Sequence, residues 1–291
     1  MLSKEAEHVK KMYREMIDFN QPLEHVRHML EQFGENIPLP EKIEHLKMNT
    51  HNVRGEWLKP LGADQKKVML YFHGGGYALG VYNSNRRFVA QLSAACNMNG
   101  FLIDYRLAPE HPYPAAIEDG INAYKYLLES GFSPENIYIA GDSSGCGLAL
   151  VVLKQLIKDE KQLPNRMVFM SPVVDLTHSN TTFESRKEVD PLQLQREFFT
   201  DKHYTHNQNT KDYKLSPIFG DLSGLPPMLI HASDHDVFLG DAQDLKQRSE
   251  SSEVEVTYKK WDQLWHNFHM NLDMVPESKR AVDEIASYMN L

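Results

Sequence analysis

Cysteine and long apolar runs are both scarce in this chain. The 291 residues include only two cysteines, Cys96 and Cys146, each within a stretch that predicts a helix. No disulfide framework is needed, and two buried thiols in a reducing compartment are the expected state. No apolar run reaches the roughly 18 residues that a membrane-spanning helix requires, so we expect no membrane segment.

Acidic residues outnumber basic ones, and this excess bears on whether the protein binds nucleic acid. The formal net charge is −9, and because phosphate binding requires a basic face, we expect no nucleic-acid partner. Residues 1–7 are too charged for a secretory signal peptide, and no repeat or low-complexity tract is present. We therefore expect one cytoplasmic domain over residues 1–291, able to bury about three quarters of its unfolded surface.

Eight short segments have the apolar or alternating pattern of strands. They lie near residues 45–50, 53–59, 67–72, 98–104, 137–141, 166–171, 227–232 and 254–260. Helical stretches separate most of them, and this alternation is typical of a mostly parallel sheet with helices on both faces. The sequence therefore predicts an α/β fold with an eight-stranded sheet.

A serine stands between two glycines where one predicted strand ends. The run Gly-Asp-Ser-Ser-Gly at 141–145 follows the apolar residues 137–140 and precedes a helix-forming stretch that starts at Cys146. Because residues without a Cβ let a strand and a helix approach closely, this order predicts a sharp turn that presents the hydroxyl of Ser143. Such a turn is typical of the nucleophile of a serine hydrolase, and an ordinary strand-to-helix turn is the alternative.

A glycine-rich loop follows the predicted strand at 67–72. It reads His-Gly-Gly-Gly at 73–76. Acyl transfer places negative charge on a carbonyl oxygen, and backbone N–H groups fixed around that oxygen lower the barrier. We predict that the N–H groups of Gly74, Gly75 and Ser144 form this oxyanion hole, and a plain flexible loop is the alternative.

The serine needs a base, and the base needs an orienting carboxylate. His266 and His269 follow the last predicted strand, and the loop position and aromatic neighbours of His266 favour it as the base. Three candidate acids follow the strand at 227–232, and spacing alone does not separate them: Asp234, Asp236 and Asp241. These histidines and aspartates have no recognised metal-ligand spacing, so we expect neither a metal nor a cofactor.

Two segments do not fit the alternation of strands and helices. Residues 1–44 and about 176–216 contain apolar side chains at helical spacing. Amphipathic helices need a surface to cover, and packing against the edge of the sheet is the simplest arrangement. Three methionines in the first segment could make a substrate pocket adaptable, with core filling as the alternative: Met12, Met16 and Met29.

Several motifs together resemble one known family. They are 73–76, 104–119, 141–145, Ser171-Pro172 with Asp175-Leu176, and His266-Asn267-Phe268. Over most of its length the chain resembles the hormone-sensitive-lipase-like branch of the α/β-hydrolases, the bacterial family IV carboxylesterases. The resemblance implies an α/β-hydrolase fold in which residues 1–44 and 176–216 form a small helical cap.

The resemblance also implies roles for individual residues. The nucleophile, acid and base correspond to Ser143, Asp236 and His266, and the oxyanion donors to Gly74, Gly75 and Ser144. The family's acid usually stands in Asp-Pro-Leu, whereas here it is Asp236-Val237-Phe238. Three charged residues of the 104–119 segment are expected to hold loops rather than take part in catalysis: Arg106, Glu110 and Asp119.

The expected function is hydrolysis of small, short-chain carboxylic esters through an acyl-enzyme. An amidase such as an arylformamidase, or a deacetylase of a small acylated metabolite, is an alternative because amide and ester cleavage share a tetrahedral intermediate. A ligand-binding protein on the same scaffold, like the plant gibberellin receptors, is a remote alternative, since those receptors lack the catalytic histidine. The predicted edge strand 254–260 allows a homodimer, and its alternating charges equally suit a solvated edge.

Overall fold

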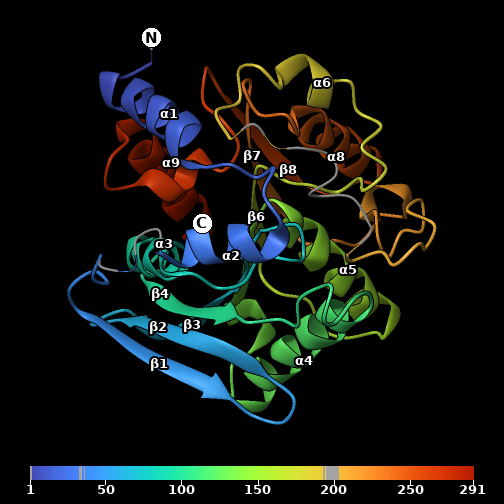
Figure 1. Cartoon of the computed structure of the whole chain (residues 1–291). Helices are drawn as coiled ribbons and strands as arrows, with labels where there is room; N and C mark the ends of the chain where they lie inside the picture. The colour runs from blue at the N-terminus through green and yellow to red at the C-terminus, as the bar shows by residue number, and fades with distance from the viewer. Residues whose placement is uncertain (1, 33–34, 36, 193, 195–202) are drawn as a thin grey trace.

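A computed structural model describes the chain apart from residues 1, 33–34, 36, 193 and 195–202. Within the described residues, eight strands form one sheet in the order β1-β2-β4-β3-β5-β6-β7-β8 (Figure 1). The strands are β1 (Ile43–Asn49), β2 (Arg54–Pro60), β3 (Asp64–Phe72), β4 (Met98–Ile103), β5 (Ile137–Asp142), β6 (Met167–Met170), β7 (Met228–Ser233) and β8 (Val256–Trp261). All eight predicted strands are confirmed, with small differences at their ends.

The sheet is parallel over most of its width. β2 runs antiparallel to β1 and to β4, whereas every neighbouring pair from β4 to β8 is parallel. Parallel strands place their carboxyl ends at one edge of the sheet. The loops that follow β3, β5, β7 and β8 therefore leave the sheet on the same side, although they lie far apart in the sequence.

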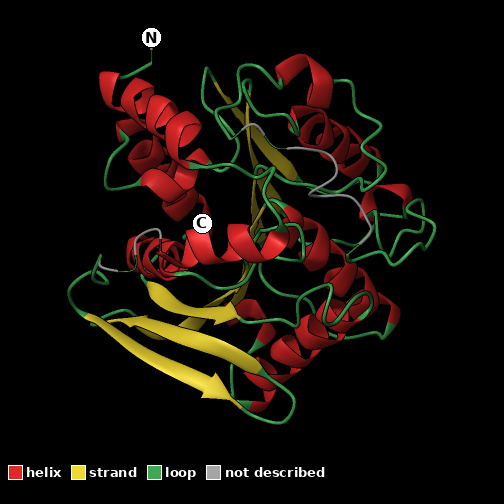
Figure 2. Ribbon diagram, viewed as in Figure 1, coloured by secondary structure: helices red, strands yellow, loops and turns green. Residues whose placement is uncertain are grey.

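Helices cover both faces of the sheet, as predicted (Figure 2). The helices are α1 (Lys4–Met16), α2 (Leu23–Gln32), α3 (Asn83–Ala95), α4 (Ala115–Glu129), α5 (Ser144–Lys158), α6 (Thr182–Arg186), α8 (Leu239–Ser251) and α9 (Pro276–Met289), with short 3-10 turns at η1 (Pro134–Asn136), η2 (Pro217–Phe219) and η3 (Phe268–Asn271). Successive side chains of β3 point to opposite faces of the sheet, and this explains why there is one buried cluster on each face. Leu70 and Phe72 belong to one buried cluster with α4 and α5, whereas Met69 and Tyr71 belong to another with α3 and α9.

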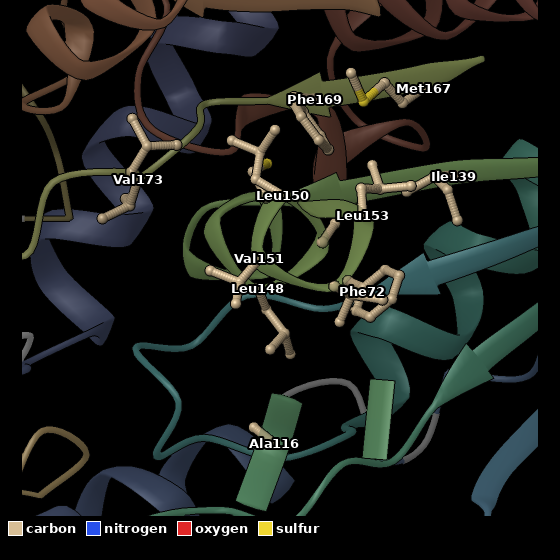
Figure 3. Close-up of a cluster of buried hydrophobic side chains, with 14 of the residues drawn as sticks. Phe72, Ala116, Ile139, Leu148, Leu150, Val151, Leu153, Met167, Phe169 and Val173 are labelled. Carbon is tan, nitrogen blue, oxygen red and sulfur yellow. The ribbon is translucent and has the colours of Figure 1, made fainter. Parts of the chain in front are cut away.

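The central helix of the larger cluster is α5. Its apolar side chains are buried almost along its whole length. Figure 3 shows Leu150 and Leu153 of this helix among side chains of the sheet, with Phe169 of β6 and Ile139 of β5 close by. This packing fixes the first turn of α5 against the carboxyl ends of the strands.

The two segments that the sequence sets apart pack on loops at this edge. Tyr13 of α1 lies in a cluster with Trp265 and Phe268, and its hydroxyl donates to Asn271 Oδ1 at 2.6 Å. In the second segment, Tyr204 stacks on another tyrosine, Tyr77, with ring centroids 3.8 Å apart. The predicted segments also contain residues 33–34, 36, 193 and 195–202, which lie outside the described residues.

The cysteines and the helices agree with what the composition predicts. Cys96 and Cys146 are buried and unpaired, as predicted. Of the helices in the described part of the chain, none has both the length and the apolarity to cross a membrane.

Candidate active site

The turn between β5 and α5 is held in a strained shape by close packing. β5 ends at Asp142 and α5 begins at Ser144, which leaves Ser143 between them with φ 51° and ψ −127°. Residues other than glycine seldom adopt a positive φ. A Cβ on Gly145 would lie 2.1 Å from the carbonyl oxygen of Phe72, so only glycine lets α5 approach β3 this closely. The predicted strand, sharp turn and helix are confirmed.

Three side chains from separate loops form a chain of hydrogen bonds at the carboxyl edge. The Nε2 atom of His266 lies 2.9 Å from Ser143 Oγ, and its Nδ1 atom lies 3.0 Å from Asp236 Oδ1. All three residues are buried, with exposed fractions of 2% for Ser143, 3% for His266 and 1% for Asp236. Since an ionised carboxylate only accepts, Nδ1 carries the proton and Nε2 is left to accept from the serine hydroxyl.

The other two candidate acids face different partners. Asp234 accepts the backbone N–H of Gln263, and Asp241 accepts the backbone N–H of Val174 at 2.9 Å. The structure therefore separates three aspartates that the sequence leaves equivalent, and places only Asp236 in contact with His266.

The remaining histidines of this region also lie apart from the serine. The Nε2 atom of His269 is 3.2 Å from Nδ1 of His231, and burial with the neighbouring imidazoles holds the pKa of His269 well below its usual value. His235 instead contacts Lys10 of α1, with Nδ1 and Nζ 2.8 Å apart. Among the described residues, no group of three or more histidine, cysteine, aspartate or glutamate side chains is placed to hold a metal ion.

The glycine loop lies against the nucleophile turn. The N–H of Gly74 donates to Asp142 Oδ1 at 3.0 Å, and the N–H of Gly76 donates to Ser144 Oγ at 2.9 Å. Gly75 has a φ of 112° and no space for a Cβ, which would lie 2.6 Å from the Cβ of Leu79. Among the hydrogen bonds of the described residues, none takes up the N–H of Gly75 or of Ser144.

A small cavity of about 150 Å³ opens beside Ser143 and His266. Its wall contains apolar side chains from both segments that were set apart in the sequence, from the glycine loop and from the histidine loop: Phe19, Leu30, Leu79, Leu192, Leu194 and Met270. In the described part of the chain, none of the three methionines lines this wall, and Met12 packs instead against the cluster of Tyr13 and Trp265, which is the core-filling alternative. Met16 is 54% exposed, and neither Met12 nor Met29 borders the cavity, because other residues of the segment face the serine.

A larger and more polar cleft of about 840 Å³ lies nearby. It borders Gly80 and Tyr82, which also line the small cavity, but it contains none of the three hydrogen-bonded side chains. The small cavity is therefore the candidate site for the reacting group.

The charge on His266 is governed by buried carboxylates. Burial alone would lower the pKa of its imidazole, but the hydrogen bond and charge of Asp236, with the charges of Asp190 and Asp142, raise that pKa above its usual value. Asp190 is fully buried in the second segment, and burial beside Asp236 raises its pKa to about 7. Its two carboxylate oxygens accept the N–H groups of Leu192 at 3.1 Å and Val237 at 3.3 Å.

The charged residues of the 104–119 segment hold loops, as expected. The Arg106 guanidinium donates to both carboxylate oxygens of Asp119 at 3.0 Å. Glu110 pairs with Arg27 of α2 at 2.6 Å, and Arg27 also donates to the carbonyl oxygen of Ala78. Arg27 therefore ties the first helical segment to the 104–119 segment through Glu110 and to the loop that follows the glycine motif through Ala78.

Sequence reasoning missed three polar residues of this site: Asp142, Asn267 and Asp190. Asp142 and Asn267 stand inside the quoted motifs, directly beside Ser143 and His266, and this adjacency is the signal that could have assigned them a role. Asp190 has no such signal, because its place depends on how the second segment packs.

Comparison with known proteins gives consistent relatives. A family model described as alpha/beta hydrolase fold matches residues 69–270. An esterase of Acinetobacter venetianus is 32% identical over 265 residues, which cover 90% of this chain and 87% of that protein. An acetyl-hydrolase of Streptomyces hygroscopicus is 34% identical over 238 residues, covering 80% of this chain and 78% of that protein. The crystal structure of an esterase from the bacterial hormone-sensitive lipase family superimposes with a TM-score of 0.95, at 30% identity, over 100% of this chain and 98% of that one.

The electrostatics of the site predict the order in which its buried histidines titrate. His266 should gain a proton at a pH above 6.5 because three carboxylates favour its imidazolium, whereas burial lowers the pKa of His73 to about 4 and that of His231 to about 3. Nitrogen NMR of histidine-labelled protein, with H266Q to assign the resonance, measures these values. A midpoint for His266 below 6.5 would mean that burial outweighs the carboxylate charges.

Proposed function

The chain belongs to the hormone-sensitive-lipase-like esterases of the α/β-hydrolase fold, and we propose that its ester hydrolysis runs through Ser143, His266 and Asp236. It is a carboxylesterase-type ester hydrolase, and the amidase, deacetylase and ligand-binding alternatives are not favoured. The observation that carries the residue assignment is the continuous contact from Ser143 Oγ to His266 at 2.9 Å and from His266 to Asp236 at 3.0 Å.

The proposed reaction has two halves. His266 Nε2 takes the hydroxyl proton while Ser143 Oγ bonds to the ester carbonyl carbon, and the proton then passes to the departing alcohol. Water, deprotonated by the same Nε2 atom, then attacks the carbonyl carbon of the acyl-serine; the bond to Ser143 Oγ breaks, Oγ takes the proton back from Nε2, and the carboxylic acid is released. Asp236 holds the proton on Nδ1 and stabilises the imidazolium that exists between the two transfers.

The oxyanion hole is part of the proposal. The N–H groups of Gly75 and Ser144 have no acceptor among the described residues, which suits them to the negative oxygen of the tetrahedral intermediate. The N–H of Gly74 already donates to Asp142, so it can serve the substrate only as a shared donor.

The residues proposed as a cap also limit the size of the substrate. We propose that residues 1–44 and 176–216 form a cap, supported by Phe19, Leu30 and Leu192, which line the small cavity beside the serine. A volume of about 150 Å³ is below the roughly 300–1,000 Å³ of pockets that take a drug-sized ligand, which suits a short acyl chain. A small ester with an acyl group of about two to six carbons is the proposed substrate.

Two broader expectations also stay proposals. β8 is an edge strand of the sheet, so two copies of the chain could pair along it as a homodimer. A cytoplasmic location is proposed from the composition, in particular from the two unpaired buried thiols.

Ser143→Ala should abolish turnover and covalent labelling by a fluorophosphonate probe. The fold should persist, because the change removes one hydrogen bond, worth about 1 kcal/mol, and keeps the backbone. Thermal melting and gel-based probe labelling measure the two effects. S249A is the matched control, since Ser249 is a buried serine of α8 away from the cavity, and it should label normally. Labelling that survives in S143A would place the nucleophile elsewhere.

Asp236→Asn should lower kcat by up to about 10⁴-fold while KM changes little, because the amide holds His266 in the wrong tautomer. Asp234→Asn removes the neighbouring carboxylate, which accepts the backbone N–H of Gln263 and lies 4.0 Å from Lys260 Nζ, and should change kcat less than about threefold. Steady-state kinetics of the two variants compare them directly. A crippled D234N beside a mild D236N would reverse the assignment of the acid.

Acyl-chain preference should peak at about two to six carbons and then fall. Each buried CH₂ adds about 0.8 kcal/mol until the cavity is full, and longer chains must then displace protein. The test is a series of p-nitrophenyl esters from acetate to palmitate, assayed below and above micelle formation. L192A should move the maximum to longer chains, whereas M16A, at an exposed position away from the cavity, should not. A maximum at long chains, or a rate jump at micelle formation, would contradict a pocket sized for short acyl chains.

A further inference from the structure

One buried carboxylate joins the nucleophile turn to the glycine loop and to the histidine loop. Asp142 is 2% exposed and immediately precedes Ser143. Its Oδ1 atom accepts the phenol of Tyr71 at 2.8 Å and the backbone N–H of Gly74 at 3.0 Å. Its Oδ2 atom accepts the side-chain amide of Asn267 at 2.7 Å. The three donors belong to β3, the glycine loop and the histidine loop.

The contact with Gly74 fixes the direction of the glycine loop. A Cβ at position 74 would lie 2.4 Å from Asp142 Oδ2, so the loop reaches the carboxylate only because the residue is glycine. An amide held by a charged acceptor makes a strong hydrogen bond. With the Gly74 amide fixed on Asp142, the next N–H, that of Gly75, is left for the substrate.

The contact with Asn267 fixes the residue that follows His266. Asn267 has a left-handed backbone, with φ 55°, which asparagine tolerates better than most residues. Its backbone N–H donates to Ser171 Oγ at 3.1 Å, and its side chain donates to Asp142. Asn267, next to the imidazole, is therefore held by two hydrogen bonds that it donates, and Asp142 accepts one of them.

The charge of Asp142 reaches the same histidine. Burial raises the pKa of Asp142, and the Tyr71, Gly74 and Asn267 hydrogen bonds oppose that rise together with the nearby imidazole. Because all its partners donate, the ionised form suits the site. The titratable groups that face Asp142 are Tyr71, Tyr105, Cys146 and His266, and those that face His266 are Asp236, Asp190, Asp142 and His269.

We propose that Asp142 is a positioning residue that holds the oxyanion loop through Gly74 and the catalytic histidine through Asn267, and that favours the charged imidazole. The inference rests on the proposed roles of Ser143 and His266. Asp142 touches neither the substrate carbonyl nor the transferred proton, and it acts through the groups that do.

The test exchanges the two partners of the 2.7 Å contact. N267D places two carboxyl groups face to face, and at pH 9, where ionisation of both sets like charges against each other and breaks the contact, kcat should fall about 100-fold. In the double variant D142N/N267D, the new amide at 142 donates to the new carboxylate at 267 and still accepts from Tyr71 and Gly74. The double variant should recover kcat to within about tenfold of the wild type.

A pH profile separates positioning from simple stability. In D142N the amide of Asn267 can turn over and keep the contact, so kcat should fall less than about tenfold. The acidic limb of kcat/KM should nevertheless move to lower pH, because a negative charge that favours the imidazolium is lost. In the double variant, where the charge returns at position 267, the limb should move back.

D241N is the matched control. Asp241 is equally buried and accepts the N–H groups of Val174 and Asp175 and the amide of Asn180, but it contacts none of the three loops. This variant should lose thermal stability while its acidic limb stays in place.

Two outcomes would overturn the inference while S143A still abolishes labelling. One is a double variant as inactive as N267D, and the other is a D142N enzyme whose acidic limb coincides with that of the wild type. Labelling that survives in S143A would instead overturn the proposed function.

Discussion

The close approach of α5 to β3 is the constraint on which the rest of the site depends. The helix can begin directly at the end of β5 only because Gly145 carries no side chain against the carbonyl of Phe72. The cost falls on Ser143, whose backbone lies in a region that strains a non-glycine residue by about 1–3 kcal/mol. Burial of the apolar side chains of β5 before the turn and of α5 after it offsets this strain, so the reactive position is held by the core.

Buried charge is the second constraint, and it opposes stability. Three carboxylates, Asp142, Asp190 and Asp236, lie buried around one imidazole, and burial disfavours the charged form of each acid. Backbone N–H groups offset part of this cost for Asp142 and Asp190. The charge of an imidazolium at His266 offsets a further part of the cost for Asp142 and Asp190. The buried negative charges are therefore best balanced at the stage of the proposed reaction when His266 is protonated.

The sequence predicted the features that depend on local pattern. All eight strands, the turn at Ser143 and the two-sided helical cover follow from hydrophobic periodicity and glycine placement, which act over a few residues. Asp236 could not be separated from Asp234 by pattern, because adjacent loop positions differ only in how the loop turns. The donation of the Gly74 amide to Asp142 was also beyond reach, since it depends on the approach of two loops.

The cavity wall was the least predictable part, because it is built from different segments than the reacting groups are. The reacting groups come from the strand ends, whereas much of the apolar wall comes from two helical segments whose facing residues depend on tertiary packing. This division lets the wall vary without moving the serine. Asp190 limits that freedom, because its oxygens accept one N–H from Leu192 in the wall and another from Val237 beside the acid. A change that shifts the second segment at Leu192 is therefore transmitted to the loop that carries Asp236.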